Sequence, residues 1–232
     1  MTLGIMQPYI FPYIGYFQLI KAVDQFVIYD DVNFINKGWI NRNRILVGGQ
    51  AYQFTIPLKD ASQNKLILEI EISKDQAWRK KLLKTIQQSY LKAPNFGVVF
   101  PMLQEIIQTP YTNIAELTVQ ALIRLCTYMD IDTEIIPSSR IYNNTHLKGP
   151  ERILDICHQT GANAYINAIG GQELYDKNRF EQEKIALSFI KSLPISYQQL
   201  KNEHIPWLSI IDILMFNSPK DVNKFLDQYE LV

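Results

Sequence analysis

Residues 3–31 read LGIMQPYIFPYIGYFQLIKAVDQFVIYDD, and the order of patterns within them decides the fold that we expect. Leu3–Met6 is a short apolar run, which predicts a strand. Pro8 and Pro12 exclude a regular helix between this strand and residue 14, because the residue before a proline avoids the helical region. The strand is therefore expected to lead into an irregular loop.

The spacing of the apolar residues then changes within the same stretch. From Gly15 to Val23 the apolar residues recur at helical spacing, which predicts a helix. Phe26–Tyr29 is a second apolar run and predicts a strand that ends at the pair Asp30-Asp31. A strand, a loop, a helix and a strand in this order form a βαβ unit, which implies a parallel sheet.

Helical and strand patterns alternate through the remaining sequence. Gly48-Gly49 lies between two apolar segments and predicts a hairpin over 44–57. A helical insert is expected at about 76–130. Further strands are expected at 66–72, 133–136, 164–166 and 185–190, the last of these being the final strand. Further helices are expected at 150–159 and from 218 onward. This alternation predicts a single α/β domain over residues 1–232.

The first helix of the insert carries a basic cluster. Trp78, Leu82, Ile86 and Tyr90 form its apolar stripe. The residues Arg79, Lys80, Lys81 and Lys84 lie off that stripe. We expect them on a solvated helix face, with a phosphate-facing patch as the alternative.

The composition excludes several classes of protein. Lys and Arg number 23 and Asp and Glu number 23, so the net charge is zero, whereas proteins that bind duplex nucleic acid usually carry a basic excess. The first twenty residues contain no Lys or Arg and are interrupted by prolines, unlike a signal peptide. No apolar run is long enough to span a membrane. We therefore expect a cytoplasmic protein whose partners are small molecules.

The cysteines and histidines show no metal-binding spacing. Cys126 and Cys157 lie within apolar helical patterns and are expected to be reduced core thiols. The three histidines are not spaced as zinc ligands, and we expect neither zinc nor haem nor flavin.

The loop and helix near the amino terminus are the first candidate for a binding site. A helix start offers free backbone N–H groups and a partial positive charge, and Gly15 would leave room there for a phosphate. Tyr13 and Tyr16 place rings and hydroxyls around the same turn, above the carboxyl end of a strand, where open α/β sheets bind ligands. The alternative is an aromatic plug that packs the loop against the sheet. The other candidates in this loop are Gln7, Pro8, Tyr9 and Pro12.

Acidic and basic side chains follow the second strand. Asp30 and Asp31 have the oxygen ligands that suit Mg²⁺ or an ammonium group, and one of them could act as a base. The alternative for this pair is a simple turn at the strand end. Arg42 is the best candidate for binding a phosphate or a carboxylate, because its guanidinium makes paired hydrogen bonds; the alternative is a surface salt bridge. The neighbouring candidates are Lys37, Asn41 and Asn43.

Three later segments supply further candidates. Ser138 and Ser139 follow a predicted strand and are suited to an anion nest. Lys148 precedes a predicted helix start, where it would neutralise a phosphate. We assign Asn167, Gly170 and Gly171 to the opposite wall of the same cleft.

Blocks of sequence spread over the chain point to one family. They are MQPYIFPYIGYFQLI at 6–20, FVIYDDVNF at 26–34, NRNRIL at 41–46, the pair Ser138-Ser139, and the segments 149–156, 161–171 and 208–212. Together they resemble the WbqC-like protein family over nearly the whole chain. The resemblance implies kinship with proteins encoded among bacterial surface-polysaccharide genes, as in O-antigen and lipopolysaccharide biosynthesis. Some of those proteins are labelled as amino-acyl or glycyl transferases that act on amino sugars.

A more distant resemblance concerns phosphate chemistry. The stretch FPYIGYFQLI at 11–20 is similar to the His-x-Gly-His signature of the nucleotidyltransferase and pantothenate synthetase superfamily, with Tyr13 and Tyr16 at the two histidine positions. This resemblance implies a Rossmann-like (HUP-type), mostly parallel sheet flanked by helices, with ATP phosphates at the helix start. Tyrosine donates a hydrogen bond but carries no positive charge near neutral pH, so the likeness is one of geometry.

Three functions remain open. The first is an ATP- and Mg²⁺-dependent ligase that activates glycine or another amino acid as an acyl-adenylate and passes it to a nucleotide-linked amino sugar. In that case Tyr13, Gly15, Tyr16, Arg42 and Lys148 would face the phosphates, and Asp31 and Asn43 would face the acceptor or the metal. The second is a transferase that takes a pre-activated acyl group and uses no ATP. The third is a non-catalytic protein that binds a nucleotide sugar. The oligomeric state stays open, with a homodimer as one alternative.

Overall fold

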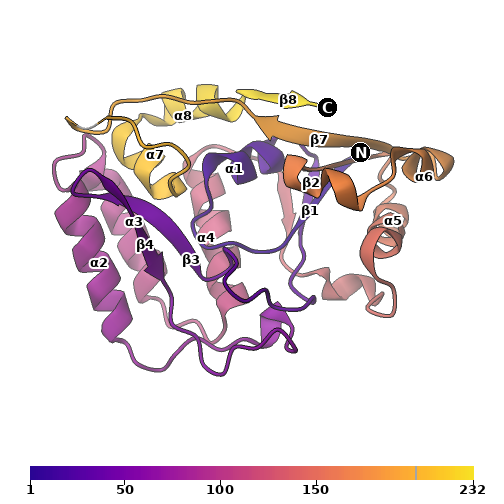
Figure 1. Ribbon diagram of the computed structural model, residues 1–232, viewed down its shortest axis with the longest axis horizontal. Coiled ribbons are helices and arrows are strands. Elements are labelled where there is room, and N and C mark those ends of the chain that lie inside the picture. Colours follow the sequence, from indigo (N-terminus) through magenta and orange to yellow (C-terminus); the bar gives the residue numbers. More distant parts are fainter. Residues whose placement is uncertain (202) are drawn as a thin grey trace.

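A six-stranded sheet forms the centre of the computed structural model, which describes residues 1–201 and 203–232. The strand order is β5 (Glu134–Ile136), β2 (Gln25–Ile28), β1 (Thr2–Met6), β6 (Ala164–Ala168), β7 (Ala186–Ser192) and β8 (Tyr229–Leu231). All neighbouring strands are parallel except β7 and β8 (Figure 1). The sequence-based prediction of a mostly parallel, Rossmann-like α/β sheet is confirmed.

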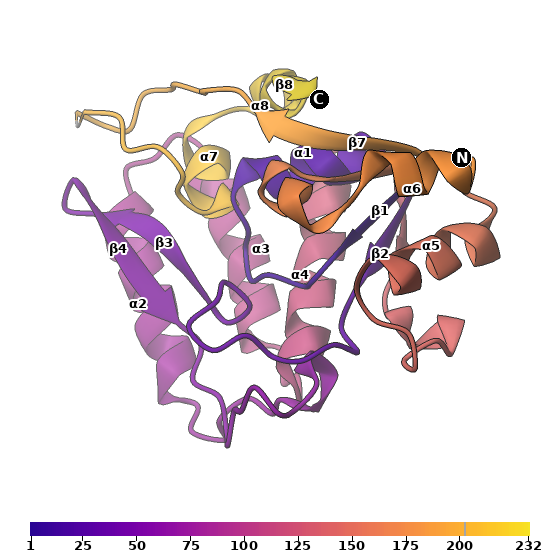
Figure 2. The same cartoon turned by 45° about the vertical axis from the view of Figure 1, so that its right-hand side comes forward.

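Helices cover both faces of this sheet, because side chains alternate along each strand. Leu3, Ile5 and Val27 belong to a core with α5 (Gly149–Thr160) and α6 (Lys177–Gln182). Phe26 and Ile28 belong to a larger core on the opposite face. Figure 2 shows α5 on one side of the strands and the helices of the insert on the other. The helices of that larger core are α1 (Ile14–Lys21), α2 (Ala77–Tyr90), α3 (Phe96–Gln108), α4 (Ile114–Tyr128), α7 (Ile210–Phe216) and α8 (Pro219–Leu226).

A separate hairpin lies beside the sheet. Its strands β3 (Arg42–Val47) and β4 (Gln50–Thr55) are antiparallel and are joined by Gly48 and Gly49, which have φ values of 59° and 79°. Positive φ at both central residues is the geometry that a two-residue hairpin turn requires, and glycine adopts it without strain. The predicted hairpin and the helices of the insert are thus present.

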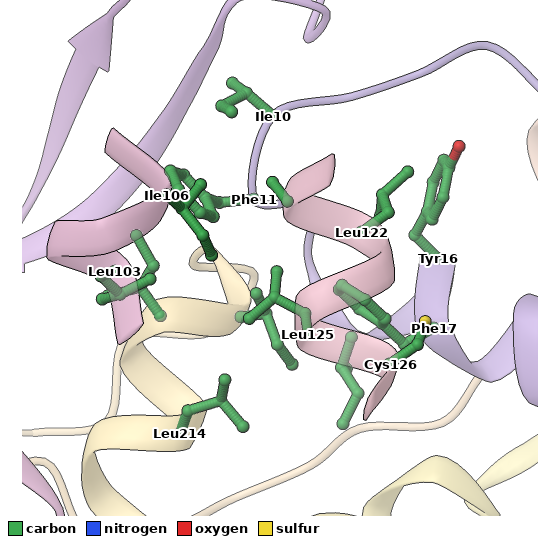
Figure 3. Packing of buried hydrophobic residues seen from close by; sticks show 14 of the residues in the cluster. Ile10, Phe11, Tyr16, Phe17, Leu103, Ile106, Leu122, Leu125, Cys126 and Leu214 are labelled. Atoms are coloured by element: carbon green, nitrogen blue, oxygen red, sulfur yellow. The ribbon is translucent and has the colours of Figure 1, made fainter. Parts of the chain in front are cut away.

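The loop between β1 and α1 is anchored in the larger core. Phe11 is fully buried, and Figure 3 shows it beside Ile106 of α3, while Phe17 of α1 lies near Leu125 and Cys126 of α4. Burial of such large rings contributes several kcal/mol to folding, of the order of 2–3 kcal/mol for each ring. The position of this loop is therefore fixed by the helical insert. Both cysteines, Cys126 and Cys157, are buried free thiols, as predicted.

The prediction of a strand over 66–72 was wrong. The segment contains a short 3-10 helix, η1 (Ile67–Glu69), flanked by isolated bridges rather than a ladder. The side chain of Glu69 accepts a hydrogen bond from the Leu66 amide at 2.8 Å, which stabilises the turn. Ile67 and Ile70 are both buried, a three-residue spacing that suits a 3-10 turn and overrides the apparent alternation.

Three other details differ from the sequence-based expectations. Arg79 is buried rather than solvated, because its guanidinium donates to the carbonyls of Ile107 and Thr109. The helix α6 was not predicted. The final strand is β8 and not β7: Tyr229, expected on the closing helix, pairs with Ser192. A strand of three residues is too short to show a period in the sequence.

Two further short 3-10 helices complete the fold, η2 (Ser139–Tyr142) and η3 (Ile169–Leu174), and each follows a strand of the parallel sheet. None of the helices in the described part of the chain has the length and apolar character that a membrane crossing requires.

Candidate functional site

The order in which the chain adds strands to the sheet reverses between β1 and β6. The chain passes from β1 to its neighbour β2 on one side and returns later to place β6 on the other side. In open α/β sheets, ligands bind at such a switch point, outside the carboxyl ends of the strands. A cavity of about 490 Å³ lies there, and we call it the switch-point cleft. Its lining includes Gln7, Tyr9, Tyr13, Gly15, Tyr16, Tyr29, Asn167, Gly170, Gly171 and Tyr175.

A second cavity of about 570 Å³ adjoins this cleft at the start of α5, and we call it the α5 cavity. The two cavities share Tyr29, Ile153 and Tyr175. The lining of the α5 cavity also includes Asp31, Asn33, Lys148, Gly149 and Arg152. Eight of the predicted site residues therefore line the cleft, and Asp31 and Lys148 line its neighbour.

The start of α1 is covered by the ring of Tyr13. A Cβ atom built on Gly15 would lie 2.4 Å from Cε2 of Tyr13 and 2.4 Å from Oγ of Ser192. The close approach of these two side chains thus requires a glycine here, which is a different reason from the phosphate contact that we expected from the sequence. Burial raises the pKa of the Tyr13 hydroxyl, and a hydrogen bond with Ser192 opposes that rise. Tyr13 is therefore a neutral wall residue of the cleft.

Tyr16 is held in the core. Its hydroxyl donates to the carbonyl of Gln7 at 2.8 Å, and its ring lies 5.5 Å from that of Phe26. Burial raises the pKa of Tyr16 well above its ordinary value. The two tyrosines of the His-x-Gly-His-like motif thus carry no charge and make internal contacts, as the aromatic-plug alternative supposed, yet a cavity remains beside them.

The start of α5 is open by comparison. Its N-cap residue Lys148 is exposed and makes no side-chain capping hydrogen bond. Gly149 has a φ of 54°, and a Cβ atom built on it would meet nothing within 4 Å. Lys148 and Gly149 thus both line the α5 cavity at the positive end of the helix, which is an arrangement suited to an anion, although Pro150 contributes no N–H group to the first turn.

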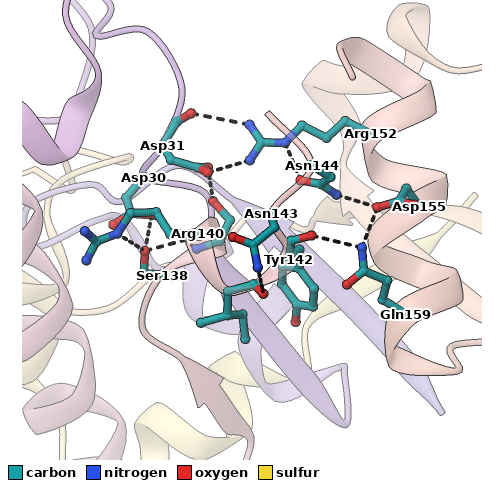
Figure 4. A network of polar contacts seen from close by, with 12 residues as sticks. Asp30, Asp31, Ser138, Arg140, Tyr142, Asn143, Asn144, Arg152, Asp155 and Gln159 are labelled. Carbon is teal, nitrogen blue, oxygen red and sulfur yellow. Dashed lines mark hydrogen bonds and ion pairs between the residues drawn. The ribbon is translucent and has the colours of Figure 1, made fainter. Parts of the chain in front are cut away.

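A buried ion pair forms the wall behind this opening. Nη2 of Arg152 lies 2.6 Å from Oδ2 of Asp31, with side-chain exposures of 4% and 2%. The other carboxylate oxygen of Asp31 accepts a hydrogen bond from Ser139, and Nε of Arg152 donates to Asn144 at 2.8 Å. Figure 4 shows this network continuing through Asp155 to Gln159. Both oxygens of Asp31 are therefore already engaged by the protein.

The neighbouring Asp30 lies outside the two cavities. Its Oδ1 accepts hydrogen bonds from the hydroxyl of Ser138 at 2.8 Å and from the amide of Ser139 at 3.2 Å. Burial raises the pKa of Asp30, although these hydrogen bonds oppose the rise. The two serines thus bind the aspartate pair and do not form a separate anion nest. Among the described residues, no group of three or more His, Cys, Asp or Glu is placed to hold a metal ion.

Several predicted residues lie away from the cleft. Nε of Arg42 donates to the carbonyl of Gly38 at 2.8 Å, and Nδ2 of Asn41 donates to that of Ile56. Lys37 is exposed on the preceding turn, and Pro8 is buried. None of these residues lines either cavity. Asn43 is buried and holds the loop, and with Pro12 it borders a third, smaller cavity.

Arg152 is the site residue that sequence reasoning missed. It stands four residues before Ile156, so both side chains lie on the same face of α5 and both are buried. An arginine on the apolar face of a helix needs a buried acid, and Asp30-Asp31 at a strand end offered one. Gly171 lines the switch-point cleft, and a glycine there has a physical reason, because a Cβ would lie 3.0 Å from Nδ2 of Asn167.

Fold and site together define a Rossmann-like α/β protein with a cleft at the switch point of its sheet. The sequence profile of the WbqC-like protein family matches residues 7–224, and the chain belongs to that family. It is 27% identical over 225 residues to a Mycobacterium tuberculosis protein named "Uncharacterized protein Rv1507c", covering 96% of each chain. No solved structure matches the chain significantly.

Proposed function

We propose that the switch-point cleft and the α5 cavity together bind one nucleotide or nucleotide-sugar ligand. The phosphates would lie at the start of α5, and the rest of the ligand would lie beside β1 and β6. The observation that supports this best is the open helix start with Lys148 at its N-cap. The two cavities share three lining residues, so a ligand that reached from one to the other would pass beside Tyr29, Ile153 and Tyr175.

The reaction that we propose is amino-acyl transfer, such as transfer of glycine, to an amino sugar in surface-polysaccharide biosynthesis; family membership supports it. In the ATP-dependent form, a carboxylate oxygen of the amino acid attacks the α-phosphorus and displaces pyrophosphate. The sugar amine then attacks the acyl carbon, AMP leaves, and the amine proton passes to solvent. The cleft would contribute mainly by holding the reactants in position. The proposal places the protein in the cytoplasm, where both nucleotides are made.

Magnesium would enter with the ATP phosphates in this proposal. Mg²⁺ is commonly held by one or two carboxylates together with substrate phosphates. Since Asp31 is engaged with Arg152 and Ser139, the described residues offer no ready-made cage. Asp31 would then act through Arg152, by holding the guanidinium at the wall of the α5 cavity.

A transferase without ATP, or a non-catalytic protein that binds a nucleotide sugar, is the second candidate. Tyr13 and Tyr16 favour it, because both make internal contacts and neither supplies the positive charge that the ATP phosphates meet in the His-x-Gly-His motif.

Calorimetric titration of the whole protein with ATP and Mg²⁺, and separately with UDP-N-acetylglucosamine, tests the binding site. Replacing Lys148 by alanine should raise Kd about tenfold, equivalent to about 1.4 kcal/mol. Lys80→Ala, an exposed change on α2, is the matched control and should leave Kd unchanged. Equal affinity in wild type and Lys148→Ala would disprove the phosphate position.

The reaction is tested by incubating the protein with ATP, Mg²⁺, glycine and a nucleotide-linked amino sugar. Release of AMP that depends on both glycine and the sugar supports the ligase. Binding of the nucleotide sugar without any response to ATP supports the second candidate.

A further inference from the structure

The third cavity, of about 180 Å³, has no role in the proposed function. It shares Tyr9 and Tyr13 with the switch-point cleft. Its remaining lining residues are Pro12, Trp39, Asn43, Arg44 and Trp207. Two of the three tryptophans in the chain therefore meet at one small cavity, which we call the tryptophan cavity.

Both tryptophans are unusually exposed. Trp39 is 41% and Trp207 is 53% accessible to solvent, although large rings are normally buried. Trp207 also has a φ of 61°, in the left-handed region that strains any residue with a side chain. Strain of this kind persists where the surrounding structure enforces it, and it is concentrated at binding sites. The ring of Trp207 is thus held at the surface by the fold.

Hydrogen bonds fix the three segments that form the walls. Nδ2 of Asn43 donates to the carbonyls of Ile10 and Phe11, which ties the hairpin to the amino-terminal loop. Just after Trp207, the amide of Ser209 donates to the carbonyl of Arg44 at 2.8 Å, and its hydroxyl donates to that of Phe11 at 2.7 Å. A ligand would meet walls that are already ordered, which lowers the entropic cost of binding.

The angles between the rings favour one class of ligand. The rings of Tyr13 and Trp207 have centroids 6.0 Å apart and are inclined at 66°, so they do not form a parallel slot for a flat base. A pyranose ring instead offers a C–H face to one aromatic ring and hydroxyl groups at its edge. Arg44, whose Cζ lies 5.5 Å from the Trp39 centroid, donates from Nη2 to the carbonyl of Trp207 at 3.4 Å, and its other N–H groups are suited to such hydroxyls.

We propose that the tryptophan cavity binds a pyranose ring. Its place beside the switch-point cleft makes that ring the acceptor sugar of the transfer reaction, and this last assignment rests on the proposed function. Binding of the sugar itself does not.

Tryptophan emission tests the proposal directly, with titration of the full chain by N-acetylglucosamine and by uridine in the absence of other nucleotides. We expect a saturable change in emission with N-acetylglucosamine and none with uridine. Trp39→Ala and Trp207→Ala should each raise Kd at least tenfold, with the remaining tryptophan of the cavity as reporter. The control is Trp78→Phe on α2, outside the cavity, which should bind as the wild type does.

Absence of a saturable response to the sugar would overturn the proposal, and so would a response to uridine alone. An unchanged Kd in both alanine variants would overturn it as well. Thermal melting identifies any variant that is misfolded, and the two separate substitutions keep the test valid if one of them fails to fold. Sugar binding without nucleotide binding would disprove the proposed function and leave this inference standing.

Discussion

Two buried aspartates show how differently the edge of the sheet and the helical core accommodate a carboxylate. Asp31, at the carboxyl end of β2, is paired with the guanidinium of Arg152 beside the α5 cavity. Asp212, in α7, accepts hydrogen bonds at 2.7 Å from each of three neutral groups. Those groups are the hydroxyls of Tyr90 and Tyr197 and the amide of Gln199.

The difference lies in the partners: Asp31 is paired with a cation, whereas the groups that donate hydrogen bonds to Asp212 are uncharged. A buried ion pair adds little net stability, since desolvation of both charges offsets their attraction, but it fixes where the charges stand. The cluster around Asp212 instead joins α2, α7 and the segment after β7, and burial raises the pKa of Asp212. We infer that the edge of the sheet keeps a positioned cation, whereas the core joins its chain segments through a carboxyl group whose pKa is raised.

Of the substitutions that test this comparison, Arg152→Met should have the largest effect on stability. It leaves the carboxylate of Asp31 buried without its cation, and we expect the free energy of unfolding to fall by about 3–5 kcal/mol. Urea denaturation measures the loss. The double variant Arg152→Met with Asp31→Leu should recover most of it, because no uncompensated charge remains. A loss below about 1 kcal/mol in the single variant would contradict the account of the ion pair.

Asp212→Asn should have a smaller effect. The change keeps the shape but turns an amide N–H group toward at least one donor, so one hydrogen bond is lost and we expect a cost of about 1–3 kcal/mol in urea denaturation. This cost is smaller than that of Arg152→Met because the tyrosine hydroxyl groups can rotate to accept a hydrogen bond as well as donate one. Asp227→Asn, at an exposed ion pair with Lys21, is the matched control and should cost less than about 1 kcal/mol. Equal losses in the two variants would rule out a special role for Asp212.

The difference in stability between the wild type and Asp212→Asn should also depend on pH. The pKa of Asp212 in the folded state is raised above its ordinary value of 3.8, so the folded protein binds the proton more tightly than the unfolded chain does. The stability of the wild type relative to Asp212→Asn should therefore increase as pH falls through the raised pKa toward 3.8. It should decrease as pH rises through the same window. Asp30 shifts in the same direction but is common to both proteins. The opposite trend in urea midpoints would contradict the raised pKa.

Glu151→Gln should have the smallest effect. Glu151 pairs with Arg179 at 3.1 Å, with side-chain exposures of 55% and 47%, so solvent screens the attraction. We expect the free energy of unfolding to fall by less than about 1 kcal/mol, and added salt should remove the difference. A loss as large as that of Arg152→Met would show that burial is not what distinguishes these two ion pairs.

Local patterns in the sequence predicted much of the fold. The first βαβ unit follows from residues 3–31, and the hairpin follows from Gly48-Gly49. The start of α4 at Asn113, whose side chain caps the amide of Glu116, and the end of α5 at Gly161 also depend on local signals. Each of these features depends on residues that are near one another in the chain, where backbone preferences act directly.

The candidate site was predicted only in part, for the same reason. Gln7, Tyr9 and Tyr13 line the cleft because they follow a strand whose carboxyl end forms its floor. Arg42, in contrast, belongs to a hairpin whose orientation depends on the helical insert, and it lies away from the cleft. The 3-10 turn at Ile67 was missed because its amides also donate to the distant carbonyls of Val32 and Asp30, and the edge strand β8 was missed because three residues are too few to show a period.

The sequence by itself determined the helical and strand periodicities of this protein, its family and the loop that borders the switch-point cleft, because these are properties of neighbouring residues. Only the tertiary structure decided which helix start is open and which is covered by Tyr13. It also decided that Arg152 meets Asp31, 121 positions away. The physical reason is that a buried charge takes the partner that folding brings to it, and chain distance does not restrict that choice.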